Sequence, residues 1–145
     1  MEGDDIFLYL NPIQSIEKYP NNSPEDFTVN LAKEINLIGN WQVCLTDITF
    51  REKRLKDFIY PLYICTDIAN CSLVGGRQLP ILGQIVLLPK KSTKMHNVSI
   101  KHLKYISVRT NSFKDIRVYI ISEQGDDKSF ISNPLSCILR LRKTF

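Results

Sequence analysis

Apolar and polar side chains alternate along the segment between residues 26 and 50. The apolar positions of this segment are Phe27, Val29, Leu31, Ile35, Leu37, Trp41, Val43 and Leu45. A period of two places them on one face of an extended chain. Gly39 and Asn40 supply a turn between the second and third groups. The pattern therefore predicts two strands, over about 27–31 and 41–50, each with one buried face and one solvated face.

The second of these strands contains a phase change. Its apolar positions are odd-numbered up to Leu45, but they are even-numbered at Ile48 and Phe50. A β-bulge adds one residue to a strand and so reverses the faces of everything that follows it. We therefore predict a bulge near Thr46 and Asp47, which would return both later side chains to the core.

Short apolar or alternating runs recur along the rest of the chain and are separated by turn-rich segments. They predict six further strands, at about 6–10, 58–68, 81–88, 103–108, 116–120 and 135–141. Pro61 limits pairing in the second of these, which we expect at a sheet edge or broken at the proline. Residues 70–80, with Gly75 and Gly76, read as a loop, and the histidines His96 and His102 fall in a loop that leads into a strand.

Eight strands without a convincing long helix are typical of an all-β sandwich or barrel. Eight strands suit a single jelly roll, in which two Greek keys form two packed antiparallel sheets. The sequence has no internal repeat, low-complexity tract or linker. We therefore expect one jelly-roll domain over residues 1–145.

The chain has 145 residues, a net charge of +4 and an ordinary apolar share of 43%. This charge is compatible with nucleic acid or an acidic partner but requires neither. The first five residues are acidic, unlike a signal peptide, and the longest apolar run is too short to span a bilayer. We therefore expect a soluble protein without a membrane span, made in the cytosol.

The four cysteines contain no Cys-x-x-Cys pair, and we expect reduced thiols that act as small apolar side chains. They are Cys44, Cys65, Cys71 and Cys137. A sharper alternative is a zinc site that uses Cys65 and Cys71 with His96 and His102. Its spacings do not match the common zinc modules. We therefore expect no metal and no cofactor.

Signals of catalysis are weak. No Ser or Cys lies in a Gly-x-Ser-x-Gly elbow. Residues 75–77 lack the Gly-Lys-Ser/Thr ending of a phosphate loop, and two histidines are too few for a metal-binding cupin. We expect neither an enzyme nor a small-molecule substrate.

Basic residues form three clusters along the chain. They are Arg51, Lys53, Arg54, Lys56, Lys90, Lys91, Lys94, Arg140, Arg142 and Lys143. They fit solvated loop tips and one solvated strand face. They also fit an electrostatic contact with DNA or an acidic partner. No clear interleaving of aromatic and basic residues is evident.

Several stretches of the sequence, in order, carry a family resemblance. They are Tyr19-Pro20-Asn21-Asn22-Ser23 with residues 26–31, Trp41-Gln42-Val43-Cys44-Leu45-Thr46-Asp47-Ile48, residues 62–68 followed by Val74-Gly75 and Pro80-Ile81-Leu82, and the closing runs 105–108, 113–121 and 139–143. Together they resemble the single jelly-roll minor capsid (penton) proteins of Polinton/Maverick elements and adintoviruses. The departures are Gln42 for Glu, Cys44 for Gly and Asp47 for Glu.

The resemblance implies a structural protein of the virion that forms homo-pentamers at the five-fold vertices of an icosahedral capsid. Its partners would be further copies of itself and a double jelly-roll major capsid protein, with packaged DNA as an additional contact. It implies synthesis in the host cytoplasm and no catalytic residue. Two other hypotheses are a nucleic-acid or acidic-partner binding module and a sugar-binding jelly roll. The last ranks lowest because most aromatic residues fall in strand phase.

Overall fold

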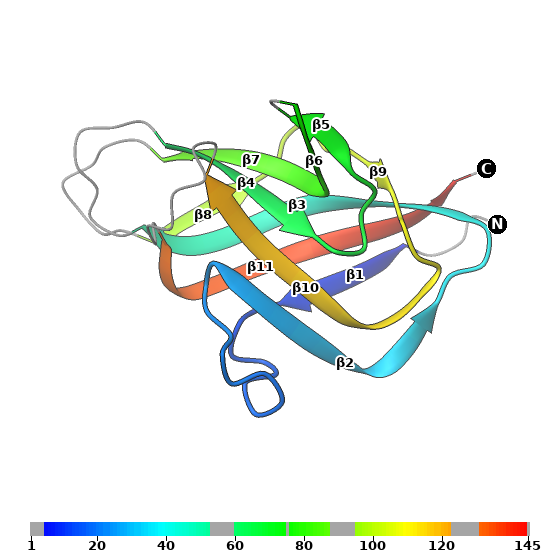
Figure 1. Ribbon diagram of the computed structural model, residues 1–145, viewed down its shortest axis with the longest axis horizontal. Helices are drawn as coiled ribbons and strands as arrows, with labels where there is room; N and C mark the ends of the chain where they lie inside the picture. The colour runs from blue at the N-terminus through cyan, green and yellow to red at the C-terminus, as the bar shows by residue number, and fades with distance from the viewer. Residues whose placement is uncertain (1–4, 53–59, 75, 88–94, 123–130, 145) are drawn as a thin grey trace.

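Two antiparallel sheets pack face to face in the computed structural model, which describes residues 5–52, 60–74, 76–87, 95–122 and 131–144 (Figure 1). The first sheet has the order β1 (Ile6–Leu10), β11 (Ile131–Thr144), β3 (Asn40–Glu52) and β8 (Met95–Ser99). The two-residue β9 (Ile106–Ser107) also pairs with β3. The second sheet has the order β2 (Asp26–Asn36), β10 (Ser112–Ser122), β4 (Tyr60–Thr66) and β7 (Ile81–Leu87).

This arrangement is a single jelly roll and confirms the expected fold class. The chain crosses between the sheets after β1, β2 and β3, returns to the first sheet at β8, and crosses again between β9 and β10 and between β10 and β11. Such crossing connections are the Greek keys of a jelly roll. In Figure 1, β10 and β2 cross in front of β11 and β1. None of the described residues forms a helix long and apolar enough to cross a membrane.

The predicted bulge in β3 is present. Ile138 of β11 lies opposite Asp47, but the next residue, Leu139, lies opposite Leu45. Thr46 is therefore the additional residue, and its hydroxyl donates a 3.2 Å hydrogen bond to the Ile138 carbonyl. Val43 and Leu45 before the bulge are buried, and so are Ile48 and Phe50 after it. The bulge thus returns both halves of the strand to the core.

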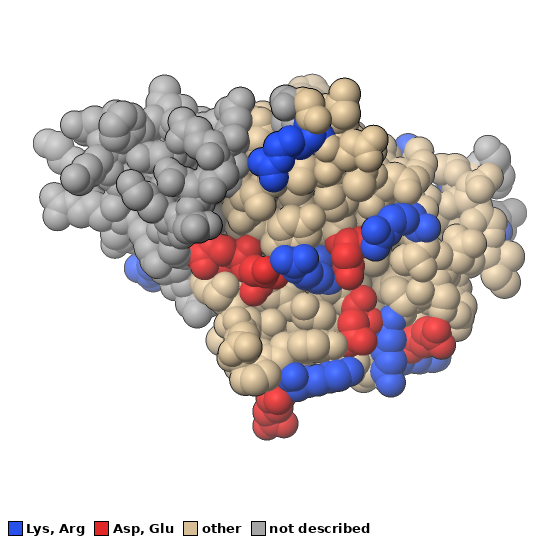
Figure 2. Space-filling model, in the orientation of Figure 1, with Lys and Arg blue, Asp and Glu red and all other residues tan. Residues whose placement is uncertain are grey.

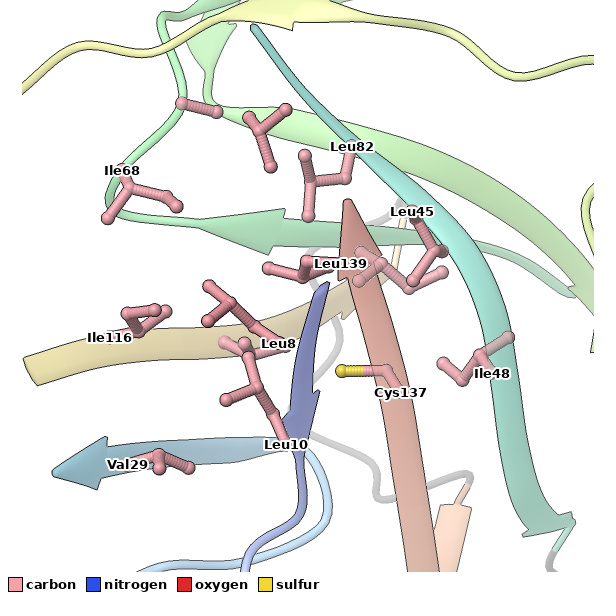
Figure 3. Packing of buried hydrophobic residues seen from close by; sticks show 14 of the residues in the cluster. Leu8, Leu10, Val29, Leu45, Ile48, Ile68, Leu82, Ile116, Cys137 and Leu139 are labelled. Carbon is pink, nitrogen blue, oxygen red and sulfur yellow. The ribbon is translucent and has the colours of Figure 1, made fainter. Parts of the chain in front are cut away.

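The core lies between the two sheets (Figure 3). Leu8 and Leu10 of β1, Leu139 of β11 and Val29 of β2 all point into it. Cys137 joins them as a small apolar side chain that is 2% exposed. The alternating pattern of the sequence therefore maps directly onto the inner faces of the sheets.

Three expectations about individual elements were wrong. Residues 95–99, read as loop, form edge strand β8, while the run at 103–108 contributes only the short β9. Residues 70–80 contain a hairpin, β5 (Ser72–Val74) and β6 (Arg77–Leu79). Strand β4 lies between β10 and β7 and is not an edge. Pro61 is the second residue of β4 and pairs with Val86 of β7, and the pairing of β4 with β10 among the described residues runs from Leu62 to Thr66.

Candidate subunit-contact surfaces

The outer side of the first sheet is built from the strand positions that alternate with the core. Arg140 of β11 lies between Phe7 of β1 and Cys44 of β3, and Arg142 lies beside Gln42 of β3. We use the term first-sheet surface for the side chains of β1, β3, β8, β9 and β11 together with Asp5 and residues 100–105. Segment 100–105 belongs here because the Ile100 amide donates to the Thr46 carbonyl over 2.8 Å.

Arg140 is held in place by charge and by an aromatic ring. Its Nε donates a 2.7 Å hydrogen bond to Asp5 Oδ2, and its Nη2 donates to the same oxygen. The guanidinium carbon lies 5.6 Å from the centre of the Phe7 ring, within cation–π range. The hydrogen bond that Arg140 donates to Asp5 raises the pKa of Arg140. The ion pair joins the start of the described chain to its last strand.

Arg142 is ordered in a similar way by a different ring. Its guanidinium carbon lies 3.3 Å from the centre of the Tyr105 ring, and Nε and Nη2 each donate a 3.1 Å hydrogen bond to Gln42 Oε1. Cys44 is fully buried, and burial raises the pKa of its thiol while a hydrogen bond with Tyr105 opposes that shift. Cys44 therefore has a specific neighbour, Tyr105.

Two aromatic side chains of β1 on this surface remain open to solvent. Phe7 is 48% exposed and Tyr9 is 65% exposed. They alternate with buried Leu8 and Leu10, so that β1 shows one face to the core and an aromatic face to the outside. Aromatic residues and arginine are enriched in protein–protein interfaces. The first-sheet surface has the composition of a contact face.

The outer side of the second sheet is charged in both signs. Arg117 of β10 forms a bidentate pair with Asp26 of β2, with Nε–Oδ1 2.9 Å and Nη2–Oδ2 2.7 Å, and it stacks on Tyr119 at 4.3 Å. The pair raises the pKa of Arg117. Figure 2 shows Lys and Arg alternating with Asp and Glu across this side of the molecule. We call it the second-sheet surface: β2, β4, β7 and β10 with residues 11–25, Asp67 and Arg109.

Asp115 organises a second polar cluster on the same surface. Its Oδ1 accepts hydrogen bonds from Asn30 Nδ2 at 2.9 Å and from the Tyr19 hydroxyl at 2.7 Å, and Lys18 Nζ lies 3.5 Å away. The bond from Asn30, followed by that from Tyr19, lowers the pKa of Asp115. The same contact raises the pKa of Tyr19. The cluster fastens the segment between β1 and β2 onto β10.

The structure separates the basic residues predicted as electrostatic contacts. Arg140, Arg142 and Lys143 lie together near the end of β11, while exposed Arg51 lies toward the opposite end of β3. The remaining six, Lys53, Arg54, Lys56, Lys90, Lys91 and Lys94, fall outside the described residues. The sequence did not predict the aromatic partners of Arg140 and Arg142, which are Phe7 and Tyr105. No sequence signal connected Tyr105 with Arg142.

The described residues form no metal-binding cluster, and two of their buried cysteines are unreactive. No group of three or more His, Cys, Asp or Glu among them could hold a metal ion. Burial raises the pKa of Cys65 and of Cys137 to about 12, which leaves both thiols protonated at neutral pH. A hollow beside the segment between β1 and β2 is lined by side chains that include Lys18, Asn22 and Asp26. The Asp26 carboxylate there is already engaged by a guanidinium.

The chain matches a solved structure over nearly its whole length. The SeMet-labelled penton protein of mavirus, known from a crystal structure, superposes with a TM-score of 0.65, and the match covers 97% of this chain and 100% of that one at 6% sequence identity. No protein-family model and no curated protein matches the sequence. At this identity the likeness establishes the fold, an all-β jelly roll of the type seen in that penton protein.

Proposed function

We propose that this protein is a minor capsid protein that forms the pentons of an icosahedral virion. It would assemble as a homo-pentamer at the five-fold vertices, beside a double jelly-roll major capsid protein, and would carry out no catalysis. The observation that carries the proposal is the end-to-end structural match with the mavirus penton protein. The ordered sequence resemblance to penton proteins of Polinton/Maverick elements and adintoviruses supports the same role and suggests that group of capsids.

The two charged and aromatic outer sides of the sandwich support an assembly role. Arginine and aromatic residues are enriched in protein–protein interfaces. Each subunit of a ring has two different surfaces that contact its neighbours. Each stable contact would bury roughly 800 Å² per partner. The described side chains offer no competing reaction centre that would explain these surfaces.

Co-expression with a double jelly-roll major capsid protein tests the proposal. The expected result is a closed shell in which electron microscopy resolves this protein at the five-fold vertices. Shells that contain it at other positions, or that exclude it entirely, would contradict the proposed role.

A binding module for DNA is a second candidate, favoured by the clustering of cations on the first-sheet surface. It predicts an affinity for DNA that falls steeply with salt concentration, because each neutralised phosphate releases counterions. A flat salt titration, or no binding at low salt, would remove it.

A further inference from the structure

The two sides of the sandwich carry different charge. Among described side chains, the first-sheet surface has six cations and two carboxylates. These are Arg51, Lys101, Lys104, Arg140, Arg142 and Lys143 against Asp5 and Asp47. The second-sheet surface has five cations and six carboxylates. These are Lys18, Lys33, Arg109, Lys114 and Arg117 against Glu17, Glu25, Asp26, Glu34, Asp67 and Asp115. The positive excess of the described residues therefore lies on one side.

The first-sheet surface is also prepared for contact. Stacking and hydrogen bonds already hold Arg140 and Arg142, so little side-chain freedom remains to be lost on binding. Phe7 and Tyr9 of the adjacent strand β1 add exposed aromatic groups to the same surface. Aromatic side chains and arginines of this kind contribute most of the binding energy in many interfaces.

We infer that the first-sheet surface binds the second-sheet surface of another copy of this chain, head to tail. Two first-sheet surfaces placed against each other would bring one positive excess onto another, and like charges across an interface are costly. The second-sheet surface instead offers a small carboxylate excess. Contacts between two different surfaces repeat from copy to copy and close into a ring when the rotation allows it.

This inference rests on the proposed vertex role and identifies the surfaces that would build it. The charges of the two surfaces also favour a second copy of the chain over DNA as the binding partner. Packaged DNA would match the positive side, but it would leave the carboxylates of the second-sheet surface without a role, and Asp5 already neutralises one of the arginines. A second copy of the chain uses both sides at once.

Site-specific photo-crosslinking tests the pairing directly. The Tyr9 position, 65% exposed, is replaced by a benzophenone amino acid in the full chain, which is irradiated at assembling concentrations and analysed by mass spectrometry. The expected crosslinks fall on the second-sheet surface of another copy, in β2, β10 or residues 11–25. Crosslinks from one first-sheet surface to another would overturn the inference.

Two substitutions supply an independent measure. Tyr9→Ser and Arg142→Glu should each raise the dissociation constant of assembly at least tenfold, measured by sedimentation velocity, with thermal melting as the check on folding. Ile38→Ser removes an apolar group that is 82% exposed in the turn before β3, outside both surfaces, and serves as the matched control. It should leave assembly unchanged.

The remaining outcomes are also decisive. Rings that form normally in both variants would overturn the inference and leave the vertex role standing. A wild-type protein that never self-associates, with or without the major capsid protein, would overturn both. If the variants weaken binding to a labelled DNA duplex but leave assembly unchanged, the first-sheet surface is a nucleic-acid site and the inference fails.

Discussion

The side chain of Asn22 pairs with both backbone groups of Thr28. Asn22 Oδ1 accepts a hydrogen bond from the Thr28 amide over 2.9 Å, and Asn22 Nδ2 donates to the Thr28 carbonyl over 2.9 Å. Thr28 lies in β2, an edge strand of the second sheet. Two residues along, the Asn30 amide donates to Ser15 Oγ over 2.8 Å. Side chains of the preceding segment thus occupy hydrogen-bonding positions that a further strand would use.

Replacing Asn22 with alanine should therefore destabilise the fold and expose the edge of β2. Two backbone groups lose their partner, at about 1 kcal/mol for each hydrogen bond. Chemical denaturation measures the loss, and hydrogen exchange should show faster exchange of the Thr28 amide. Open edge strands also promote pairing between molecules, so aggregation should rise on storage. The exposed neighbour Asn21→Ala is the control, and equal behaviour of the two variants would contradict the role given to Asn22.

Asp115 should make the stability depend on pH. Hydrogen bonds from Asn30 and Tyr19 lower its pKa in the folded protein, so its ionised form stabilises the fold above the unfolded pKa of about 3.9. This contribution is lost as the pH falls through the lower, folded pKa. Asp115→Asn should cost about 1 kcal/mol at pH 7, a modest value because the side chain is 40% exposed.

Denaturation curves of both proteins from pH 7 to pH 2 provide the measurement. The difference between wild type and Asp115→Asn should shrink toward the acid end, because the wild-type carboxyl is then neutral as well. A difference that stays constant down to pH 2 would refute the electrostatic explanation.

The cysteines should differ sharply in reactivity and in tolerance to substitution. Cys71 is exposed, whereas Cys44, Cys65 and Cys137 are buried. A thiol reagent should label Cys71 in the folded protein and the other three only after unfolding. Cys137→Ser should cost about 1–3 kcal/mol, because a hydroxyl would be buried among apolar side chains, while Cys71→Ser should be neutral. Rapid labelling of all four thiols in the folded state would contradict this assignment.

Much of the fold could be predicted because its core strands are half-buried and alternate. The bulge at Thr46 is the clearest case. When the apolar positions of a strand change from odd to even numbers, one additional residue keeps all of them on the buried face. Strand β1 was equally legible, with its bounds at Ile6 and Leu10. In both strands, burial of one face requires apolar residues at every second position of the sequence.

Other features have no local signature. Strand β8 lies at a sheet edge with Met95, Asn97 and Ser99 exposed, so little in its own side chains distinguishes it from a loop. The stacking of Arg142 on Tyr105 joins residues far apart in sequence, and only the fold brings them together. The proposed contact surfaces therefore could not be predicted from the sequence alone, although Arg51, Arg140, Arg142 and Lys143 of the first-sheet surface belong to its basic clusters.

Native mass spectrometry of the purified chain can determine whether the proposed homo-pentamer forms. We expect a species with five times the 16.8 kDa mass of the monomer, either alone or after addition of the major capsid protein. Electron microscopy of the same sample should show closed five-fold rings. A protein that remains strictly monomeric under both conditions, or that forms only a symmetric dimer, would contradict it.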